Sequence, residues 1–423
     1  MVPGKEPAVF NVKAVVRETK LKPDTLRAWE RRYGLPRPQR SAGGQRLYSQ
    51  RDIDTLKWLV SRQEEGLSIS RAVDLWRAAS PTPDTGIWRS GDLDALRADW
   101  LSHCAAFREA EAERVLAHAF SFHTVEAVCV AILQKGVAEL NDRWYQGEAT
   151  VQQVYFASEL VVRHMEGLLA SAPRPARPER LFVACPPQEG HTLGALLVSL
   201  LLRRQGWDVL YLGASVPLEN LDTTLSAAKL NLVILVAQQL TTAASLLEAA
   251  RLVTHAGIPL AYGGRIFNQL PALRPYIPGY FIGESLVDTP QVVGRLLSGP
   301  FRLPSADPVP VEYQQALAHY LSRQPMLEAE VLQAMTRLEI PDAQVTHANG
   351  FLTRNIAAAL AFGDMSLLDQ EIIWLEGLFS NHRMPISSLY RYLHAYYMAA
   401  KAHLDPRGRP VVTWLAHITG HES

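Results

Sequence analysis

The stretch that decides the fold reads LFVACPPQEGHTLG and covers residues 181–194. Its first five residues form a short apolar run beside prolines, which favours a buried strand over a helix. A loop, 186–190, and an apolar segment that predicts a helix, 192–202, follow. Glu189, His191 and Gly194 lie at this junction. A neutral imidazole there can bind a metal through one ring nitrogen while the carboxylate holds the other. Taken alone, the spacing also fits a surface loop with an incidental histidine.

The pattern of short strands and helices continues downstream. Further apolar runs predict strands over 207–212, 232–237 and 258–262, with helices between them. This alternation predicts a doubly wound, flavodoxin-like parallel sheet, in which ligands bind beyond the carboxyl ends of the strands. His191, Ser215, Gly263 and Gly264 all fall at such ends.

Together these residues resemble the cobalamin-binding domain of methionine synthases, mutases and related regulators. The pattern of that family is Asp-x-His-x-x-Gly, then a Ser loop, then Gly-Gly; Glu189 stands where Asp is usual and can make the same hydrogen bond. The resemblance implies that His191 replaces the dimethylbenzimidazole base beneath cobalt. It also implies that the freed nucleotide tail lies in a slot between sheet and helices. The cofactor contacts that it assigns to this domain are Glu189, His191, Gly194, Ser215, Val216, Leu218, Gly263 and Gly264.

Composition predicts a multidomain cytoplasmic protein. The 423 residues have room for three or four domains. No apolar run is long enough to span a membrane, and the first residues lack the apolar core of a signal peptide. The three scattered cysteines suit a reducing compartment. Residues 1–80 hold 16 Lys and Arg against 9 Asp and Glu, a net charge of +7, whereas the remainder holds 26 against 33. The basic end is therefore the expected nucleic-acid contact.

This basic end has the pattern of a winged helix-turn-helix. Helices are predicted over 11–18, 24–33, 49–65 and 69–76, with a turn signal at 42–44 between two extended segments. The runs LRAWERRYG (26–34) and QRLY (45–48) resemble the winged DNA-binding domain of MerR-type regulators. The second helix of such a domain enters the major groove, and wing arginines contact phosphates. The alternative is a solvated basic face. The predicted DNA-contacting residues are Arg27, Arg31, Arg32, Tyr33, Arg40, Arg46 and Tyr48.

Four helices are predicted over 93–105, 109–121, 124–143 and 150–169, which indicates a small helical bundle. The stretch LNDRWYQGE (140–148) resembles the cap over cobalamin in light-responsive MerR repressors of the CarH type. The resemblance implies that Trp144 shields the upper axial group; a core tryptophan is the alternative. The family has a Glu-His pair where this chain has Val154 and Tyr155. Because neither side chain ligates cobalt well at neutral pH, capture of cobalt by a histidine is expected to be absent, unless His164 or His123 substitutes.

After a linker, 304–310, the chain is again helical, with helices predicted over 312–322, 326–335, 346–361, 366–379 and 386–404. Seven of the 13 histidines lie in this region, and tyrosines cluster between 390 and 397. It resembles the globin-like photoglobin domains of photocobilins, which implies biliverdin as a second chromophore. No cysteine follows Cys185, so a thioether-linked bilin is excluded here. The predicted bilin contacts are His382, Arg383, Arg391 and Tyr396. The alternative is an oligomerisation domain with an aromatic core.

Four domains are thus predicted: the winged domain (1–80), the helical cap (92–171), the cobalamin-binding domain (179–302) and the all-α globin-like domain (312–423). We expect a non-enzymatic transcriptional regulator that senses light through adenosylcobalamin, with biliverdin as second chromophore. Its partners would be a double-stranded DNA operator and further copies of itself, as a light-dependent dimer or tetramer, and no membrane. The alternative is a regulator that senses the abundance of cobalamin. A cobalamin enzyme would need a substrate barrel for which no strands remain, and a pure adaptor would not need the basic winged domain. The operator sequence, repression against activation, the upper axial ligand and the direction of the oligomer switch are open.

Overall fold

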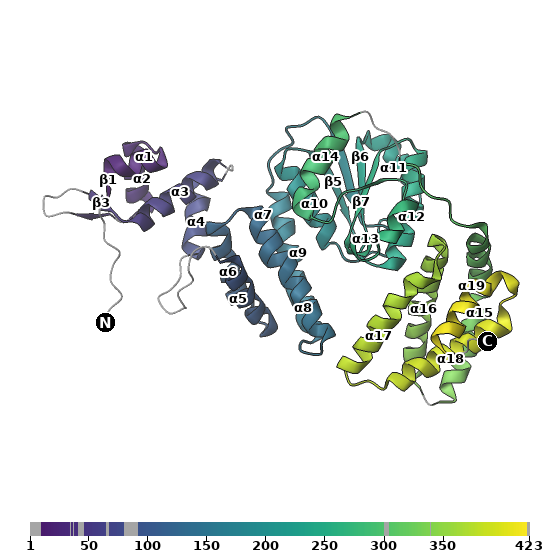
Figure 1. Ribbon diagram of the computed structural model, residues 1–423. Helices are drawn as coiled ribbons and strands as arrows, with labels where there is room; N and C mark the ends of the chain where they lie inside the picture. The colour runs from purple at the N-terminus through teal and green to yellow at the C-terminus, as the bar shows by residue number, and fades with distance from the viewer. Residues whose placement is uncertain are drawn as a thin grey trace. The chain divides into compact units, whose positions relative to one another are not determined.

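The computed structural model describes residues 10–33, 35–36, 38–40, 46–64, 67–79, 92–299, 304–338 and 340–420. The chain divides into two compact units, 1–138 and 139–423, and each is described by itself. The boundary falls inside helix α8 (Lys135–Tyr145), so the predicted cap contributes to both units. Figure 1 labels the helices and strands.

The first unit begins with a small antiparallel sheet in the order β1-β3-β2. Asn11 accepts the N–H of Ala14 at 3.0 Å and so begins α1, and Lys20 in the left-handed conformation ends it. Val15, Leu26 and Tyr48 belong to the buried core between the helices and the sheet. The predicted extended segments pair as strands, and the turn at 42–44 lies outside the described residues. The elements are β1 (Phe10–Asn11), α1 (Val12–Thr19), α2 (Pro23–Tyr33), β2 (Gln39–Arg40), β3 (Arg46–Tyr48), α3 (Gln50–Glu64) and α4 (Ile69–Ala79).

The rest of the first unit is helical. Its elements are α5 (Leu93–Ala105), α6 (Glu109–Phe122), α7 (Val125–Val128) and a π-helical turn, η1 (Cys129–Gln134), that leads into α8. The sequence predicts one regular helix over 124–143, whereas the structure widens it at η1. The Arg97 guanidinium donates to the carbonyl of Ala131 at 3.0 Å inside this turn. Residue 136, just after this turn, is a glycine. A Cβ at this position would lie 2.7 Å from the buried ring of Trp100.

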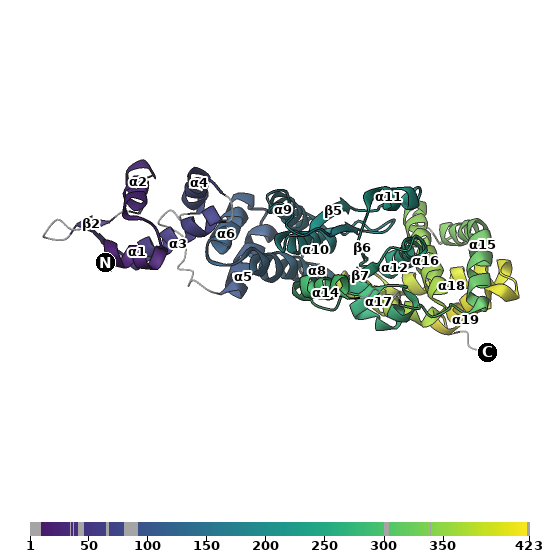
Figure 2. The ribbon, with the colours of Figure 1, turned by 90° about the horizontal axis from the view of Figure 1, so that it is seen from above.

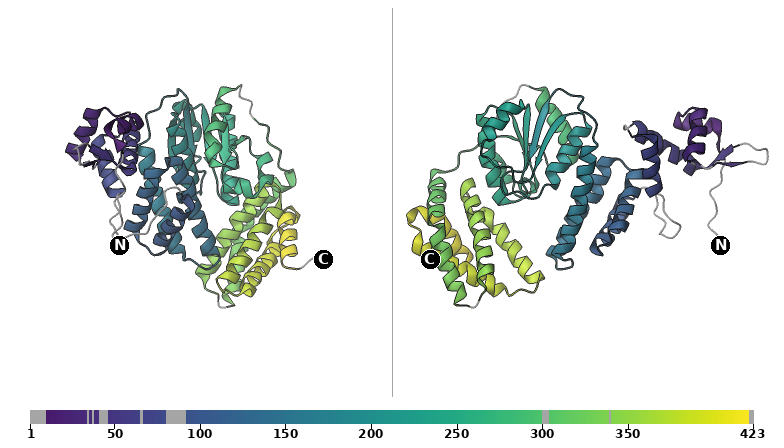
Figure 3. Two further views of the ribbon diagram at one scale, coloured as in Figure 1. Left: turned by 60° about the vertical axis from the view of Figure 1, so that its left-hand side comes forward. Right: turned by 180° about the vertical axis from the view of Figure 1, so that it is seen from behind.

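The second unit contains a five-stranded parallel sheet in the order β5-β4-β6-β7-β8, which is the flavodoxin-like order that the sequence predicts. Alternate residues of β4 face opposite cores: Leu181 and Val183 face α10 and α14, while Phe182 and Ala184 face α11 and α12. Helices therefore cover both faces (Figure 3). The elements are α9 (Val151–Ala170), β4 (Arg180–Ala184), α10 (Leu193–Arg204), β5 (Asp208–Gly213), α11 (Leu221–Ala228), β6 (Leu232–Val236), α12 (Leu240–His255), β7 (Leu260–Gly263), α13 (Arg265–Gln269), η2 (Pro271–Tyr276), β8 (Tyr280–Phe281), η3 (Leu286–Asp288) and α14 (Thr289–Ser298).

A helical segment follows the sheet, and α15, α16 and α18 lie side by side in it (Figure 2). The sequence predicts a break between two helices near Pro325, but α15 continues through this proline. Buried Tyr320, Leu327 and Val331 share one face of α15, and their packing outweighs the loss of one backbone hydrogen bond. The elements are α15 (Val311–Thr336), α16 (Asp342–Phe362), η4 (Met365–Leu368), α17 (Asp369–Asn381), α18 (Ile386–His403), η5 (Pro406–Gly408) and α19 (Arg409–Ile418).

This helical segment shares a hydrophobic core with the α11 and α12 side of the sheet. The rings of Tyr276 and Phe362 lie 6.1 Å apart in an edge-to-face arrangement. The predicted linker is part of the packing, since Val309 is buried and the N–H of Asp307 donates to the carbonyl of Pro275 at 2.9 Å. The predicted boundary between 302 and 312 therefore separates segments that pack as one body.

Within the described part of the chain, no helix combines the length and the apolar character that crossing a membrane requires.

Candidate cofactor and DNA sites

A buried carboxylate holds the imidazole of His191 at the carboxyl edge of the sheet. Glu189 is fully buried in the loop between β4 and α10, whereas the His191 side chain is 63% exposed. Glu189 Oε1 lies 2.7 Å from His191 Nδ1 and accepts the His191 main-chain N–H at 2.9 Å. Glu189 Oε2 accepts the main-chain N–H of Gln238 at 2.7 Å and the hydroxyl of Thr242 at 2.6 Å. In all four contacts the Glu189 carboxylate is the acceptor. The loop that carries His191 is therefore fixed by its own groups and by Gln238 and Thr242, which follow β6.

The charge state of Glu189 decides the tautomer of the ring. Burial by itself raises the pKa of Glu189, but the hydrogen bonds from His191, Thr242 and Gln238 outweigh burial and lower this pKa below its ordinary value. An ionised carboxylate only accepts, so Nδ1 of His191 carries the proton. In the neutral ring the exposed Nε2 then presents its lone pair.

The loop that follows β5 is hydrogen-bonded to the loop that carries Glu189 and His191. The N–H of Ser215 donates to the carbonyl of Glu189, and the N–H of Gln188 donates to the hydroxyl of Ser215, both at 3.0 Å. Val216 donates its N–H to the carbonyl of Cys185 at 3.0 Å. The side chains of Val216 and Leu218, predicted cofactor contacts, are half-buried and pack against the core on the α12 side of the sheet.

The three predicted glycines lie where parts of the chain approach one another closely. A Cβ on Gly264 would lie 1.8 Å from the carbonyl oxygen of Ala237, and its φ of 123° suits only glycine. On Gly263 a Cβ would lie 2.9 Å from Ile282 Cγ1, and on Gly194 3.0 Å from Gln238 Nε2. The close approach of the Ala237 carbonyl therefore requires glycine at 264, whether or not a cofactor is bound.

Gln238 and Thr242 are functional candidates that sequence reasoning missed. Besides its bond to Glu189, Gln238 accepts the N–H of Arg265 through Oε1 at 3.2 Å, and so joins the loops after β4, β6 and β7. The available signal was the run QQLTT at 238–242, directly after the apolar run at 232–237.

The donor set fits a corrinoid. Among the described residues, no group of three or more His, Cys, Asp and Glu side chains could hold a metal ion. A bare ion of the zinc type takes three or four protein ligands. A single oriented imidazole instead suits a metal that brings its own equatorial ligands, as cobalt in a corrin does. Nε2 of His191, oriented by the carboxylate, is a donor of the kind that such a metal accepts.

The predicted cap residues lie at the end of α8 and on the first turn of α9. Tyr155 is 68% exposed and Val154 is half-buried. Trp144 is half-buried, with its ring centroid 5.8 Å from that of His382 and 6.4 Å from that of Trp374. The structure thus brings Trp144 together with one of the predicted bilin contacts.

The other predicted bilin contacts do not converge on His382. Arg383 is exposed in a turn with φ of 57°, and Arg391 is exposed and donates to the carbonyl of Ser387 in its own helix. Tyr396 is fully buried, and its hydroxyl lies 2.6 Å from that of Tyr320. Tyr396 was predicted as a bilin contact; here its hydroxyl belongs to the internal polar network of the helical segment.

The second helix of the winged domain presents part of the predicted DNA-contacting surface. Arg27 is exposed, 3.8 Å from Asp24, and Arg32 is exposed with its guanidinium carbon 5.5 Å from the ring centroid of Tyr33. The side chains of Arg31 and Arg40 lie outside the described residues.

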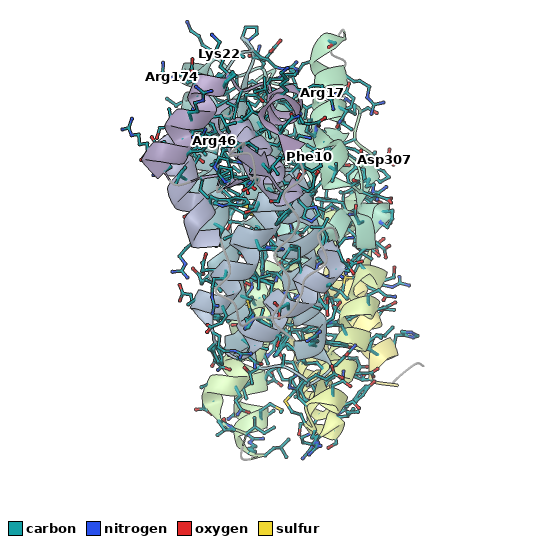
Figure 4. All side chains as sticks on the ribbon, turned by 90° about the vertical axis from the view of Figure 1, so that its left-hand side faces the viewer. Phe10, Arg17, Lys22, Arg46, Arg174 and Asp307 are labelled. Carbon is teal, nitrogen blue, oxygen red and sulfur yellow. The ribbon has the colours of Figure 1, made fainter. Side chains whose placement is uncertain are left out.

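Glu30 ties the wing to this helix. Its carboxylate accepts from Arg46 Nε at 3.0 Å and from the Tyr48 hydroxyl at 2.6 Å. Burial, followed by the Glu30 hydrogen bond, raises the pKa of Tyr48. Tyr48 is fully buried, which corrects its prediction as a DNA contact: it supports the wing from inside. Two exposed cations that sequence reasoning did not single out, Arg17 and Lys22, lie on the surface of this domain (Figure 4).

Fold and site together define a class: a winged DNA-binding domain in one chain with a flavodoxin-like sheet whose rim presents one carboxylate-held histidine. Residues 10–78 match the MerR HTH family regulatory protein model, and residues 179–285 and 96–168 match two models of the B12 binding domain.

Two relatives extend these matches. The HTH-type transcriptional repressor CarA of Myxococcus xanthus is 34% identical over 211 residues, which cover 49% of this chain and 69% of CarA. The repressor CarH of the same organism is 31% identical over 221 residues, which cover 49% of this chain and 71% of CarH. Among solved structures, the monomethylamine corrinoid protein of Methanosarcina barkeri is 16% identical with a TM-score of 0.41, over 48% of this chain and 100% of that one. From its sequence relatives, the chain belongs to the family of MerR-type, cobalamin-binding transcriptional regulators that includes CarA and CarH.

Proposed function

We propose that this protein is a light-responsive transcriptional regulator that binds adenosylcobalamin with His191 as the lower axial ligand of cobalt. The observation that carries the proposal is the pair of Glu189 and His191, a buried carboxylate that fixes the tautomer of an exposed imidazole. Adenosylcobalamin, when bound, supplies a cobalt–carbon bond that light breaks.

Different residues of the chain would contact the two faces of the cofactor. His191 Nε2 would bind from below, and Glu189, supported by Gln238 and Thr242, holds the neutral ring in the tautomer whose lone pair lies on Nε2. Trp144, Val154 and Tyr155 would border the upper face. Since valine cannot ligate and a phenol is a poor ligand for cobalt at neutral pH, the light response would depend on movement of the cap and not on histidine capture.

DNA binding would respond because several basic winged domains held in one assembly multiply the salt-sensitive phosphate contacts. The exposed Arg27 and Arg32 of each domain supply part of this charge. A homo-oligomer, dimer or tetramer, whose assembly depends on light therefore belongs to the proposal.

The experiment compares protein loaded with adenosylcobalamin in the dark and after green light. Loss of operator binding, together with a change in sedimentation, is the expected result. If the operator affinity stays the same although the absorption spectrum shows complete photolysis, a sensor of cobalamin abundance replaces a light sensor. Identical sedimentation in dark and light would remove the oligomer switch alone.

Biliverdin as a second chromophore is a separate part of the proposal. Its support is the resemblance of the histidine- and tyrosine-rich helical segment to photoglobin domains. His382, Arg383 and Arg391 are its remaining candidate contacts at accessible positions. Titration with biliverdin should produce a red absorption band in addition to the cobalamin bands. If no band forms, the helical segment is an oligomerisation or positioning domain.

A further inference from the structure

The end of cap helix α8 contacts helix α17, which lies more than two hundred residues further along the chain, inside the same compact unit (Figure 1). The ring of Tyr145 stacks on that of Trp374, with centroids 5.6 Å apart and planes 20° apart. The Tyr145 hydroxyl donates to the carbonyl of Trp374 at 3.3 Å. In return, Asn381 Nδ2 donates to the carbonyl of Tyr145 at 3.0 Å.

His382, the residue after Asn381, contacts Trp144. His382 Nε2 lies 2.9 Å from the Trp144 carbonyl, which can only accept, so Nε2 carries a proton. The Trp144 ring also has the rings of His382 and Trp374 as neighbours. Side chains from each partner therefore reach the main chain of the other, and this arrangement fixes both position and orientation.

Two glycines make the close approach possible. A Cβ on Gly377, in the middle of α17, would lie 1.9 Å from the Tyr145 hydroxyl oxygen. A Cβ on Gly147, just after α8, would lie 2.8 Å from the carbonyl oxygen of Asn381. Gly377 has no turn to make, since it lies inside a regular helix, where glycine is unfavourable relative to alanine. Glycine is needed at position 377 because the Tyr145 hydroxyl occupies the space that a side chain would fill.

Near the other end of α17, burial raises the pKa of Glu371, and the positive charge of Arg265 opposes this shift. Arg265 directly follows Gly264 at the carboxyl end of β7. Helix α17 has 13 residues, a length of about 20 Å at 1.5 Å per residue. Its residues from Trp374 to Asn381 carry the contacts to the end of α8.

We infer that α17 and His382 form a clasp that holds the end of α8 and thereby positions Trp144. The C-terminal helical segment is then a positioning module for the cap: it is rigidly joined to the sheet through the shared core, and it sets where the cap residues lie above the cofactor. This inference rests on the proposed function for the role of Trp144, while the clasp itself concerns contacts within the chain alone.

The test uses Gly377→Ala in the full-length protein. The added methyl collides with the Tyr145 hydroxyl, while alanine favours the α17 helix itself. The matched control is Gly167→Ala in α9, where a Cβ meets nothing within 4 Å. Trp374→Ala removes the stacking partner, and Trp374→Phe restores an aromatic ring.

Two measurements follow. In protein without cofactor, amide hydrogen exchange of residues 139–147 should become about tenfold faster in Gly377→Ala and Trp374→Ala, and stay unchanged in Gly167→Ala. In protein loaded with hydroxocobalamin, cyanide should replace the upper ligand several-fold faster in the same two variants, as followed by absorbance. Trp374→Phe should recover most of the wild-type rates in both measurements.

Unchanged exchange of residues 139–147 in both variants would overturn the clasp. Faster exchange with an unchanged rate of cyanide substitution would overturn the positioning of the cap over the upper face. Failure of the wild type to retain hydroxocobalamin would instead refute the proposed function, and the exchange measurement would still decide whether the clasp exists.

Discussion

Replacing Glu189 by glutamine keeps the shape of the side chain but changes one acceptor oxygen into a donor NH2. Four donors converge on this side chain: the main-chain N–H and Nδ1 of His191, the N–H of Gln238 and the hydroxyl of Thr242. If the amide NH2 faces Gln238, a buried main-chain N–H loses its acceptor, although the Thr242 hydroxyl can turn to accept. If it faces His191, Nδ1 has to accept, and the ring proton moves to Nε2.

Either orientation carries a defined penalty. An unpaired buried N–H costs about 1–3 kcal/mol in the free energy of unfolding. The tautomer change removes the lone pair that would bind cobalt under the proposed function, and loss of such a supporting partner weakens metal binding about 10- to 100-fold. We therefore expect Glu189→Gln to lower both the free energy of unfolding and the affinity for hydroxocobalamin. His191→Ala should abolish ligation by nitrogen, and it should cost about 1–3 kcal/mol of stability because it removes the Nδ1–H donor from the buried Glu189 carboxylate.

The assay combines urea unfolding of the cofactor-free protein, absorbance titration with hydroxocobalamin, and electron paramagnetic resonance of the reduced complex, where an axial nitrogen splits the cobalt signal. Ser199→Ala is the control, because Ser199 is a buried hydroxyl that donates within its own helix, to the carbonyl of Ala195 at 2.8 Å. Wild-type affinity and an unchanged nitrogen splitting in Glu189→Gln would refute the assigned tautomer and the supporting role of the carboxylate.

Three further results are expected. Gly264→Ala places a Cβ 1.8 Å from the Ala237 carbonyl oxygen and should destabilise by more than about 4 kcal/mol, whereas Gly283→Ala, at φ of 99° with nothing within 4 Å, should cost about 1–2 kcal/mol in the same urea titration. Arg27→Ala should reduce the slope of log affinity against log salt by about 1 if the side chain contacts a phosphate, as measured by fluorescence anisotropy. Burial and then the charge of Glu113 raise the pKa of Cys104 to about 12; because this thiol is protonated and fully buried in the folded protein, its alkylation at pH 8, followed by mass spectrometry, should be slow and become fast only when urea unfolds the protein.

The sheet could be read from the sequence because its signals are local. Each strand of a covered parallel sheet is a short apolar run between turn residues, and the predicted strands agree with the structure within one or two residues at each end. Strand β8 was missed because it has only two residues. The apparent break at Pro325 was wrong because packing on both sides holds α15 together, and no local pattern reports packing.

Two tyrosines, Tyr48 and Tyr396, show the same limit of prediction from the sequence. Tyr48 was predicted as a DNA contact and Tyr396 as a bilin contact from resemblances to known families, but a phenol can serve either a binding surface or a core. Both are fully buried, and their hydroxyls bond to Glu30 and Tyr320. Only the tertiary structure shows which side of a helix or strand faces inward when both faces carry amphipathic side chains.

The sequence by itself determined the order of the domains, the parallel sheet, the basic winged end and the pair of Glu189 and His191, whose two members are close enough along the chain to interact in the loop that connects strand to helix. Tertiary structure alone decided what completes the site. Gln238 and Thr242 reach Glu189 from about fifty residues away, and Trp374 and His382 reach the end of α8 from more than two hundred. Such contacts depend on how separate hydrophobic faces pack against one another, and that information is spread over the whole chain.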